Sequence, residues 1–259
     1  MDNKIIPCFF FCLILVIHPS FAQEGKYTVS NAHAHNDYNH PRPFFTAYEA
    51  GFGSIEADIF LKNGELFVAH DSGGIRLDKT LTNLYLEPLQ EKITKNRGHV
   101  YLDSLKHLLL LIDLKTEAES TLDALLKLLE KYQPLINSSS LKIVITGNQP
   151  DRSKFPSYPS WLFFDGKPTQ NYSADERKKI ALFSDNFKNY SKWEGEDVLN
   201  KSDRKKIKRA VKQAHKFQLP IRFWNAPDNE KSWKELIRLK VDYLNTDRIG
   251  DISKFLGRD

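Results

Sequence analysis

One stretch, from His33 to Asp71, constrains this chain more than any other, because acids and histidines recur in it beside short apolar segments. Residues 27–33 are β-branched and apolar and predict a strand. Residues 43–50 suit a short helix, which two glycines end, and residues 54–61 predict the next strand. Strand, helix and strand in succession imply parallel pairing, so the chain opens with a βαβ unit.

Two acids on the second of these strands are two residues apart. Glu56 and Asp58 therefore point to the same face of the sheet. Asn63-Gly64 is a strong two-residue hairpin signal, which would return His70 toward both acids. Two carboxylates on one face are costly unless a positive group lies between them, and a hard divalent cation usually fills that place.

The rest of the chain continues the alternation of strands and helices. We predict further strands at residues 108–113, 141–146, 160–164, 180–184, 219–224 and 242–246, and helices at residues 80–92, 117–132, 202–217 and 229–240. In the helix at 117–132, Thr116 and Glu119 have the spacing of a capping box. Eight strands with interleaved helices predict an α/β fold of the (β/α)8 TIM-barrel type.

Asp113 ends a buried run of leucines and an isoleucine, which places its carboxylate at the barrel mouth beside Lys115. Together with Glu56 and Asp58 it would complete a set of three hard oxygen ligands. Such a set is typical of a Mg²⁺ or Ca²⁺ site that keeps positions for water and phosphate oxygens.

These motifs in combination resemble the glycerophosphodiester phosphodiesterase and phosphatidylinositol-phospholipase-C-like superfamily. Its pattern is a histidine after the first strand, Glu-x-Asp on the second, and His-Asp after a hairpin. The start His35-Asn36-Asp37-Tyr38 is similar to a fungal and bacterial branch, and Leu-Ile-Asp113-Leu-Lys115-Thr is similar to sphingomyelinase D. The resemblance implies a PLC-like barrel that hydrolyses phosphoric diesters.

The resemblance also implies roles for single residues. His35 and His70 would be the general acid and base, because one histidine of the family deprotonates the nucleophile and the other protonates the leaving oxygen. Asn36 and Lys115 would hold phosphate oxygens. Trp224 resembles a tryptophan of the family's substrate cavity, although ordinary barrel packing explains it equally well.

The sequence departs from ordinary glycerophosphodiesterases at two places. Their His-Arg-Gly is His35-Asn36-Asp37 here, and their Glu-Asn-Thr becomes Phe44-Phe45-Thr46. An arginine that would clamp phosphate bidentately is thus missing at that position. We therefore expect a glycerophosphodiester or phospholipid-type substrate without choosing the headgroup.

Two rival functions remain open. The pair His33 and His35 also resembles the His-x-His zinc pair of amidohydrolase-type barrels, which would need further histidine ligands from later strands. A non-catalytic barrel that binds lipid or carbohydrate is the second alternative.

Residues 1–22 have the composition of a signal peptide. Lys4 gives a positive start, a long apolar run follows, and Ser20-Phe21-Ala22 suits cleavage before Gln23. Both cysteines of the chain lie in this segment. We expect residues 23–259 to form one cysteine-free domain without a transmembrane segment, exported to a bacterial periplasm or secreted.

The formal net charge of +5 is concentrated in residues 201–216, which hold eight Lys or Arg and one Asp. A solvated outer face of a barrel helix is the simplest interpretation of this run. Contact with anionic lipid headgroups is the alternative. An exported chain without a nucleic-acid-binding motif makes a nucleic-acid partner improbable.

Overall fold

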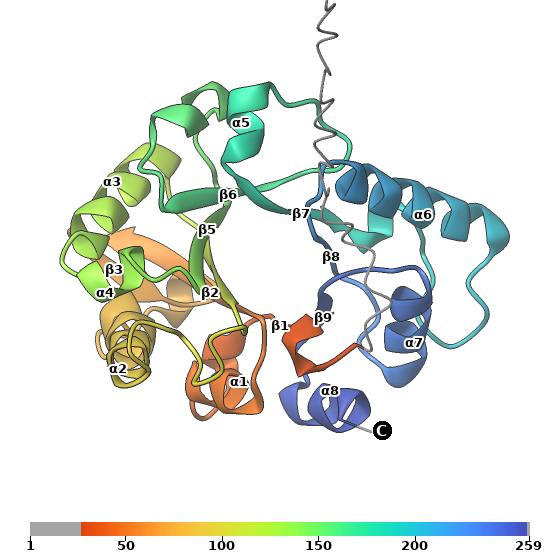
Figure 1. The fold of residues 1–259 in the computed structure, drawn as a ribbon, viewed down its shortest axis with the longest axis horizontal. Coiled ribbons are helices and arrows are strands. Elements are labelled where there is room, and N and C mark those ends of the chain that lie inside the picture. Colours follow the sequence, from red (N-terminus) through yellow and green to blue (C-terminus); the bar gives the residue numbers. More distant parts are fainter. Residues whose placement is uncertain (1–26, 258–259) are drawn as a thin grey trace, which may run out of the picture.

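The computed structural model describes residues 27–257, and its centre is a ring of eight parallel strands (Figure 1). The strands are β1 (Ala32–Ala34), β2 (Ser54–Lys62), β4 (Leu108–Leu114), β5 (Leu141–Gly147), β6 (Leu162–Gly166), β7 (Ile180–Asn186), β8 (Ile221–Trp224) and β9 (Leu244–Thr246). Their order is β8-β7-β6-β5-β4-β2-β1-β9, and a bridge between Arg222 and Tyr243 joins the two ends. The predicted (β/α)8 barrel is confirmed.

The predicted hairpin is present beside the barrel. β3 (Glu65–Val68) pairs antiparallel with β2, and Lys62 lies opposite Glu65. The two residues between them, Asn63 and Gly64, have φ angles of 52° and 81°, as a tight hairpin turn requires. The hairpin thus turns at the carboxyl end of β2 and brings the chain back beside Asp58, whose carbonyl oxygen accepts from the Ala69 amide, and the next loop begins there.

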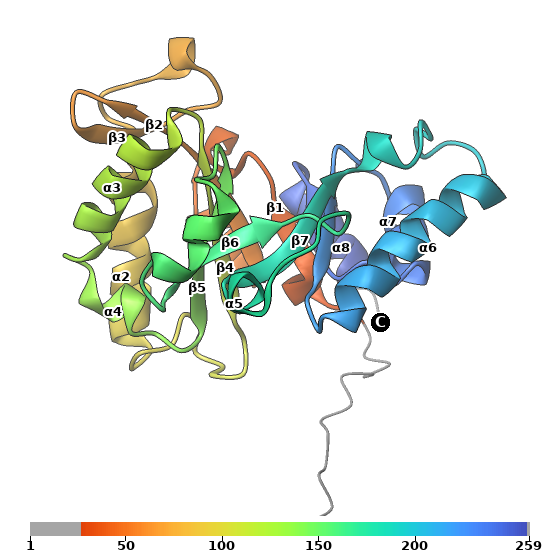
Figure 2. The ribbon, with the colours of Figure 1, turned by 90° about the horizontal axis from the view of Figure 1, so that it is seen from above.

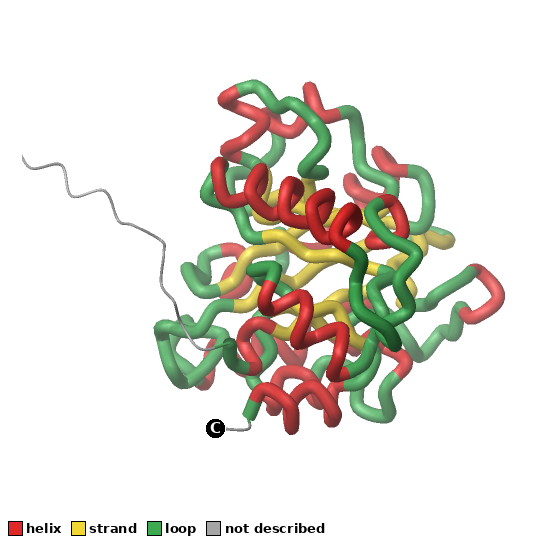
Figure 3. Tube along the Cα trace, turned by 90° about the vertical axis from the view of Figure 1, so that its right-hand side faces the viewer, coloured by secondary structure: helices red, strands yellow, loops and turns green. Residues whose placement is uncertain are grey.

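Helices surround the ring of strands, as Figure 3 shows. They are α1 (Phe45–Ala50), α2 (Glu87–Lys95), α3 (Ala118–Leu129), α4 (Gln133–Ile136), α5 (Ala174–Lys178), α6 (Lys201–Lys216), α7 (Glu230–Arg238) and α8 (Ile249–Leu256). The short helices α4 and α5 and the C-terminal α8 were not predicted. The predicted helix at 80–92 is present with shifted bounds: a π-helical turn (Thr82–Leu86) leads directly into α2, which ends at Lys95.

Two local predictions need correction. The first strand begins only at Ala32, because Val29–Asn31 forms a 3₁₀ turn closed by a capping box between Thr28 and Asn31. The cap of α3 is Glu117 and not Thr116. The Glu117 carboxylate accepts hydrogen bonds from the backbone amides of Glu119 and Ser120. The Thr116 hydroxyl accepts from the backbone amide of Leu61 on β2 instead, so it ties the helix start to the sheet.

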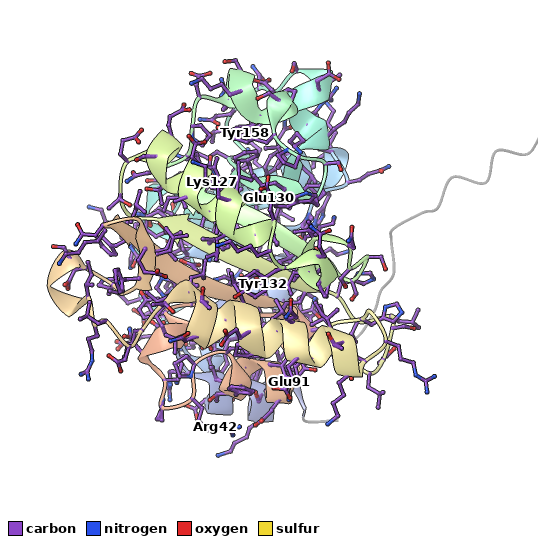
Figure 4. All side chains as sticks on the ribbon, turned by 90° about the vertical axis from the view of Figure 1, so that its left-hand side faces the viewer. Arg42, Glu91, Lys127, Glu130, Tyr132 and Tyr158 are labelled. Carbon is purple, nitrogen blue, oxygen red and sulfur yellow. The ribbon has the colours of Figure 1, made fainter. Side chains whose placement is uncertain are left out.

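The helices bury one apolar face each. On α3, which Figure 4 shows in front, Leu122, Leu125 and Leu129 are buried, whereas Lys127 and Glu130 project outward. On α6 the buried residues are Ile207, Ala210, Val211 and Ala214, and most of its lysines are exposed. Within residues 27–257, no helix is long and apolar enough to cross a membrane.

The interior of the barrel changes from apolar to polar along its axis. Leu109 and Leu111 of β4 lie in an apolar cluster with Val144 of β5 and Leu182 of β7. Strand alternation places Asp113 on the same face one step further along β4. The carboxyl ends of the strands are therefore polar, and the long loops at 69–81 and 187–200 rise from this end of the barrel (Figure 2).

Candidate active site

Three acids meet at the polar end of the barrel. Asp58 of β2 and Asp113 of β4 are partners in the parallel register, and Glu56 lies two residues earlier on β2. Ligand oxygens of these three side chains lie within 4.8 Å of one another, and Glu56 and Asp58 are buried. The structure thus brings together the acids that the sequence had singled out from two separate strands.

The arrangement of these acids fits a divalent cation. Asp58 Oδ1 and Asp113 Oδ1 are buried and have no hydrogen-bond partner among the described residues. Burial and the neighbouring Glu56 charge raise the pKa of Asp58 to about 6, although the Lys115 ammonium opposes them. Burial also raises the pKa of Asp113. Buried, crowded carboxylate oxygens without donors form the hard donor set that Mg²⁺ or Ca²⁺ prefers.

Gly147, at the end of β5, makes room for Asp113. Its φ angle is +73°, and a Cβ atom at this position would lie 2.0 Å from Asp113 Oδ1 and 2.7 Å from the Leu114 carbonyl oxygen. No side chain fits there, so glycine leaves the Asp113 carboxylate in place.

A lysine is paired with two of the acids. Lys115 Nζ lies 2.9 Å from Asp58 Oδ2 and 3.1 Å from Asp113 Oδ2, and its side chain is about one-quarter exposed. The same residue lines the cavity at the barrel mouth. Lys115 therefore lies where an ammonium group can neutralise acids and also reach an incoming phosphate.

His35 follows β1 and is held by the last strand of the barrel. Its Nδ1 lies 2.9 Å from Asp247 Oδ1, and the Asn36 amide donates to the same oxygen over 3.2 Å. Burial lowers the pKa of His35, but the hydrogen bond to Asp247 and the Glu56 charge outweigh it, so the pKa is raised. Because Nδ1 is engaged, Nε2 is the ring nitrogen that remains for proton exchange.

His70 approaches the acids from the hairpin side, as the turn predicts. Its Nδ1 lies 3.7 Å from Asp58 Oδ2 and 3.2 Å from the Tyr38 hydroxyl. The Tyr38 hydroxyl is also 2.7 Å from Asp58 Oδ2. Asp71 caps the following 3₁₀ turn by accepting from the Gly74 amide.

Hydrogen bonds of its own side chains hold the loop of residues 35–44 that follows β1. Asn36 has a φ angle of 48°, and its side-chain oxygen accepts from the Tyr38 hydroxyl over 2.7 Å. The buried carboxylate of Asp37 accepts from the Phe44 amide and from the Tyr85 hydroxyl. Within His-Asn-Asp-Tyr, the aspartate thus shapes the loop, while its neighbours reach the site.

His33 lies below the site and is fully buried. Burial and the Arg222 charge lower its pKa to about 3, so the ring is neutral. Its Nδ1 lies 2.7 Å from the Ser54 hydroxyl, and its Nε2 lies 2.8 Å from Glu56 Oε2. Among the described residues, the candidate metal cluster contains acids and no histidine, which counts against the zinc amidohydrolase alternative.

Arg222 of β8 is a site residue that the sequence interpretation missed. It is 3% exposed and pairs with Glu56 Oε2, and its Nε donates to the Ser184 hydroxyl over 3.2 Å. Although burial raises the pKa of Glu56, the Arg222 charge and the His33 hydrogen bond hold it well below its usual range. An arginine inside the otherwise apolar segment Ile221–Trp224 was the available signal.

A cavity of about 370 Å³ opens over these residues. His35, Glu56, Asp58, His70 and Asp113 line it together with the candidate substrate residues Asn36, Lys115 and Trp224. Trp224 is 40% exposed, so it is a cavity wall and not a packed core residue. Thr146 of β5, Asp165 of β6 and Ser184 of β7 also line the cavity, and none of the three was predicted.

Comparisons with known proteins agree with this geometry. The AIM6-like phosphodiesterase domain matches residues 25–150, and the glycerophosphoryl diester phosphodiesterase family matches residues 220–248. Altered inheritance of mitochondria protein 6 of Kluyveromyces lactis is 28% identical, over 88% of this chain and 72% of the relative. Its homolog in Arthroderma benhamiae is 26% identical, over 84% of this chain and 81% of that protein.

A solved structure shows the same fold. The glycerophosphodiester phosphodiesterase from Parabacteroides distasonis superposes with a TM-score of 0.58 and 18% sequence identity, covering 90% of this chain and 98% of that one. Both family matches, together with the acids and histidines at the barrel mouth, support the predicted resemblance to the glycerophosphodiester phosphodiesterase and phosphatidylinositol-phospholipase-C-like superfamily.

Proposed function

We propose that the protein is a divalent-metal-dependent phosphodiesterase that acts on glycerophosphodiester or phospholipid-type substrates. The observation that carries this proposal is the convergence of Glu56, Asp58 and Asp113, with two unpartnered buried oxygens, between His35 and His70. Two buried acid oxygens without a hydrogen-bond partner among the described residues, at the floor of an open cavity, favour a binding or catalytic role over a purely structural one.

The three acids would hold Mg²⁺ or Ca²⁺, which when bound would neutralise charge on the phosphate oxygens. Proton transfer and positioning of the phosphate would be carried out by side chains of the protein. His35, oriented by Asp247, takes or gives a proton at Nε2, and His70 serves the opposite side of the phosphate. Lys115 places an ammonium group toward the cavity.

The attacking group is either water or a hydroxyl of the substrate, because the sequence offers no serine in a strained elbow and residues 23–259 contain no cysteine. Sphingomyelinase D, which the region around Asp113 resembles, uses a substrate hydroxyl and forms a cyclic phosphate. A hydroxyl group next to the phosphoester attacks within the same molecule and needs no ordered water, so proximity favours it as the nucleophile over water.

The test is a hydrolysis screen of residues 23–259 with glycerophosphodiesters, lysophospholipids and phosphoinositides, each with Mg²⁺, Ca²⁺ or chelator. Asp113→Asn should lose metal-dependent turnover while it keeps the fold. Asp123→Asn, which changes an exposed acid on α3 outside the cavity, is the matched control. If no diester is turned over with any metal, the non-catalytic binding barrel becomes the better proposal.

We also propose that the protein is exported through residues 1–22, which lie outside the described residues. The support is the charge, apolar run and cleavage pattern of that segment. Expression of the whole chain should give a processed protein that begins at Gln23 in the periplasm or medium. An unprocessed chain in the cytoplasm would contradict this proposal.

The cationic face of α6 is a separate question. Solvation of this face is the simplest interpretation, and contact with anionic lipid is the alternative. Co-sedimentation with phosphatidylserine vesicles separates them, with a triple glutamine variant of the exposed Lys205, Lys208 and Lys212 as the comparison. Binding that this variant loses would support membrane contact.

A further inference from the structure

Two leucines at the amino end of the barrel lie almost entirely in solvent. Leu102 is 90% exposed and Leu105 is 85% exposed, and both belong to the loop of residues 96–107 between α2 and β4. Single exposed apolar residues are common on protein surfaces and need no explanation. Two of them on one short loop, by contrast, form a small apolar patch, which indicates an interaction site.

Hydrogen bonds hold this loop in a defined shape. The Tyr101 hydroxyl donates to the Phe52 carbonyl oxygen over 2.5 Å. The Asp103 carboxylate accepts from the Leu105 amide over 3.0 Å, and the Asp103 carbonyl oxygen accepts from the Lys106 amide, which closes a tight turn. Because the turn is defined in this way, the fold itself presents the leucines to solvent and leaves their surface open to a partner.

The charged residues beside these leucines in the chain are mostly basic. Lys95, Arg97 and Lys106 are exposed. Asp103 is the one acid between residues 95 and 107, so this segment, which we call the amino-end patch, has a net charge of +2 with its histidines neutral. The patch therefore combines apolar surface with excess positive charge.

The two long loops at the mouth of the barrel have a different composition. Residues 69–81 hold two cations and two acids around the exposed Leu77, and residues 187–200 hold two cations and three acids around the exposed Val198. Their net charges are thus 0 and −1, so neither loop attracts an anionic surface. Of these three segments, the amino-end patch is the one that suits such a surface.

An anionic lipid membrane is the occupant that fits the amino-end patch best. Leucine side chains partition favourably into the boundary between headgroups and acyl chains, and lysine or arginine side chains beside them attract anionic headgroups. Two of the three cations are lysines, which are depleted at interfaces between proteins. The combination of leucine and lysine therefore favours a lipid surface over a second protein.

The amino-end patch lies at the opposite end of the barrel from the cavity. The loop of residues 96–107 precedes β4, whose far end carries Asp113, and the long loops of the mouth rise from that far end (Figure 2). No residue of the patch is among those that line the cavity. A membrane that covers the patch would therefore leave the cavity open to water.

We propose that the amino-end patch is a docking surface for an anionic phospholipid membrane. Leu102 and Leu105 insert between the lipids, and the three cations contact the headgroups. The cavity faces away from the membrane, so diesters dissolved in water can enter it while the protein is docked. Docking of this kind does not depend on the catalytic proposal, because the patch shares no residue with the cavity.

Co-sedimentation of residues 23–259 with vesicles tests the docking surface. We expect binding to phosphatidylserine vesicles, weaker binding to phosphatidylcholine vesicles, and a loss of binding as salt screens the exposed charges. Leu102→Ser combined with Leu105→Ser should lower the partition coefficient roughly 100-fold, on the basis of about tenfold for each leucine. Arg97→Gln combined with Lys106→Gln should lower it roughly 25-fold, on the basis of about fivefold for each cation.

Matched variants elsewhere on the surface are the controls. Leu77→Ser changes a leucine that is 84% exposed but lies at the mouth. The triple glutamine variant of α6 removes three cations from another face. Both should bind vesicles like the native protein, and thermal denaturation should show the native fold for every variant. Hydrolysis of a water-soluble diester should be the same for the double serine variant and the native protein.

A fluorescent label separates insertion from adsorption by charge. Residues 23–259 contain no cysteine, so Leu105→Cys provides a single attachment point for an environment-sensitive nitrobenzoxadiazole dye. With phosphatidylserine vesicles, the emission of this dye should shift to the blue and be quenched by nitroxide-labelled lipid. The same dye on Leu77→Cys should show neither change.

Several results would overturn the docking surface. They are an absence of binding to phosphatidylserine vesicles, a dye at position 105 that stays in water, and equal losses for Leu77→Ser and the double serine variant. Binding that the triple glutamine variant loses and the double serine variant keeps would assign the contact to α6. A dimer in sedimentation velocity that the double serine variant abolishes would show that a second copy of the chain covers the leucines instead.

Discussion

Replacement of Gly147 by alanine should damage the site through a single methyl group. The residue has a φ angle of +73°, which only glycine adopts without strain. The new Cβ would lie 2.0 Å from Asp113 Oδ1 and 2.7 Å from the Leu114 carbonyl oxygen. The carboxylate can rotate away, but the backbone carbonyl belongs to β4 and cannot, so both β4 and the Asp113 side chain must shift.

The expected magnitude has two parts. Left-handed strain costs about 1 to 2 kcal/mol for a residue with a Cβ atom. Overpacking against fixed atoms adds roughly 1 to 3 kcal/mol. The free energy of unfolding should therefore fall by about 2 to 5 kcal/mol, which lowers the melting temperature by roughly 4 to 20 °C for a chain of this size.

Gly64→Ala is the matched control. Gly64 also has a positive φ angle, +81°, but no atom lies within 4 Å of its added Cβ. Calorimetric melting of both variants, with and without Mg²⁺, separates strain from contact. Gly64→Ala should show the strain alone and keep stabilisation by the metal, whereas Gly147→Ala should lose most of it. If the two variants melt together and bind Mg²⁺ equally, the role assigned to Gly147 is refuted.

Further predictions concern the chemistry of the site. His35→Ala and His70→Ala should each lower kcat roughly 10²-fold or more, the usual scale for acid–base groups, and His33→Ala should lower it less; a larger effect of His33 would show that the motif is misplaced. Because Asp247 raises the pKa of His35, Asp247→Asn should lower that pKa, so the acidic limb of the kcat/KM profile should move to lower pH if His35 is the base; an unmoved limb would assign the base elsewhere. Excess chelator and Asp113→Asn should each abolish activity, and full turnover in either case would exclude the proposed metal site. Phosphorus NMR of early products should show a cyclic phosphate when the substrate has a hydroxyl next to the phosphoester, whereas equal turnover after methylation of that hydroxyl would show that water attacks directly.

The alternation of strands and helices and the three candidate acids could be predicted from the sequence, because both follow from local patterns. Alternation along a strand puts Glu56 and Asp58 on one face, and the apolar run before Asp113 ends where its strand ends. The Asn63-Gly64 turn fixed the hairpin in the same way, through backbone conformations that few residue pairs tolerate.

The way in which distant strands complete the candidate site became visible in the three-dimensional fold. Asp247 meets His35 because the last strand pairs with the first, and Arg222 reaches Glu56 because the barrel closes between its ends. His33 lies inside β1 and is buried and neutral, whereas His35 follows the end of that strand and lies at the mouth of the barrel. Hydrogen bonds and burial of this kind depend on strands far apart in the sequence, and no local pattern specifies which of them become neighbours.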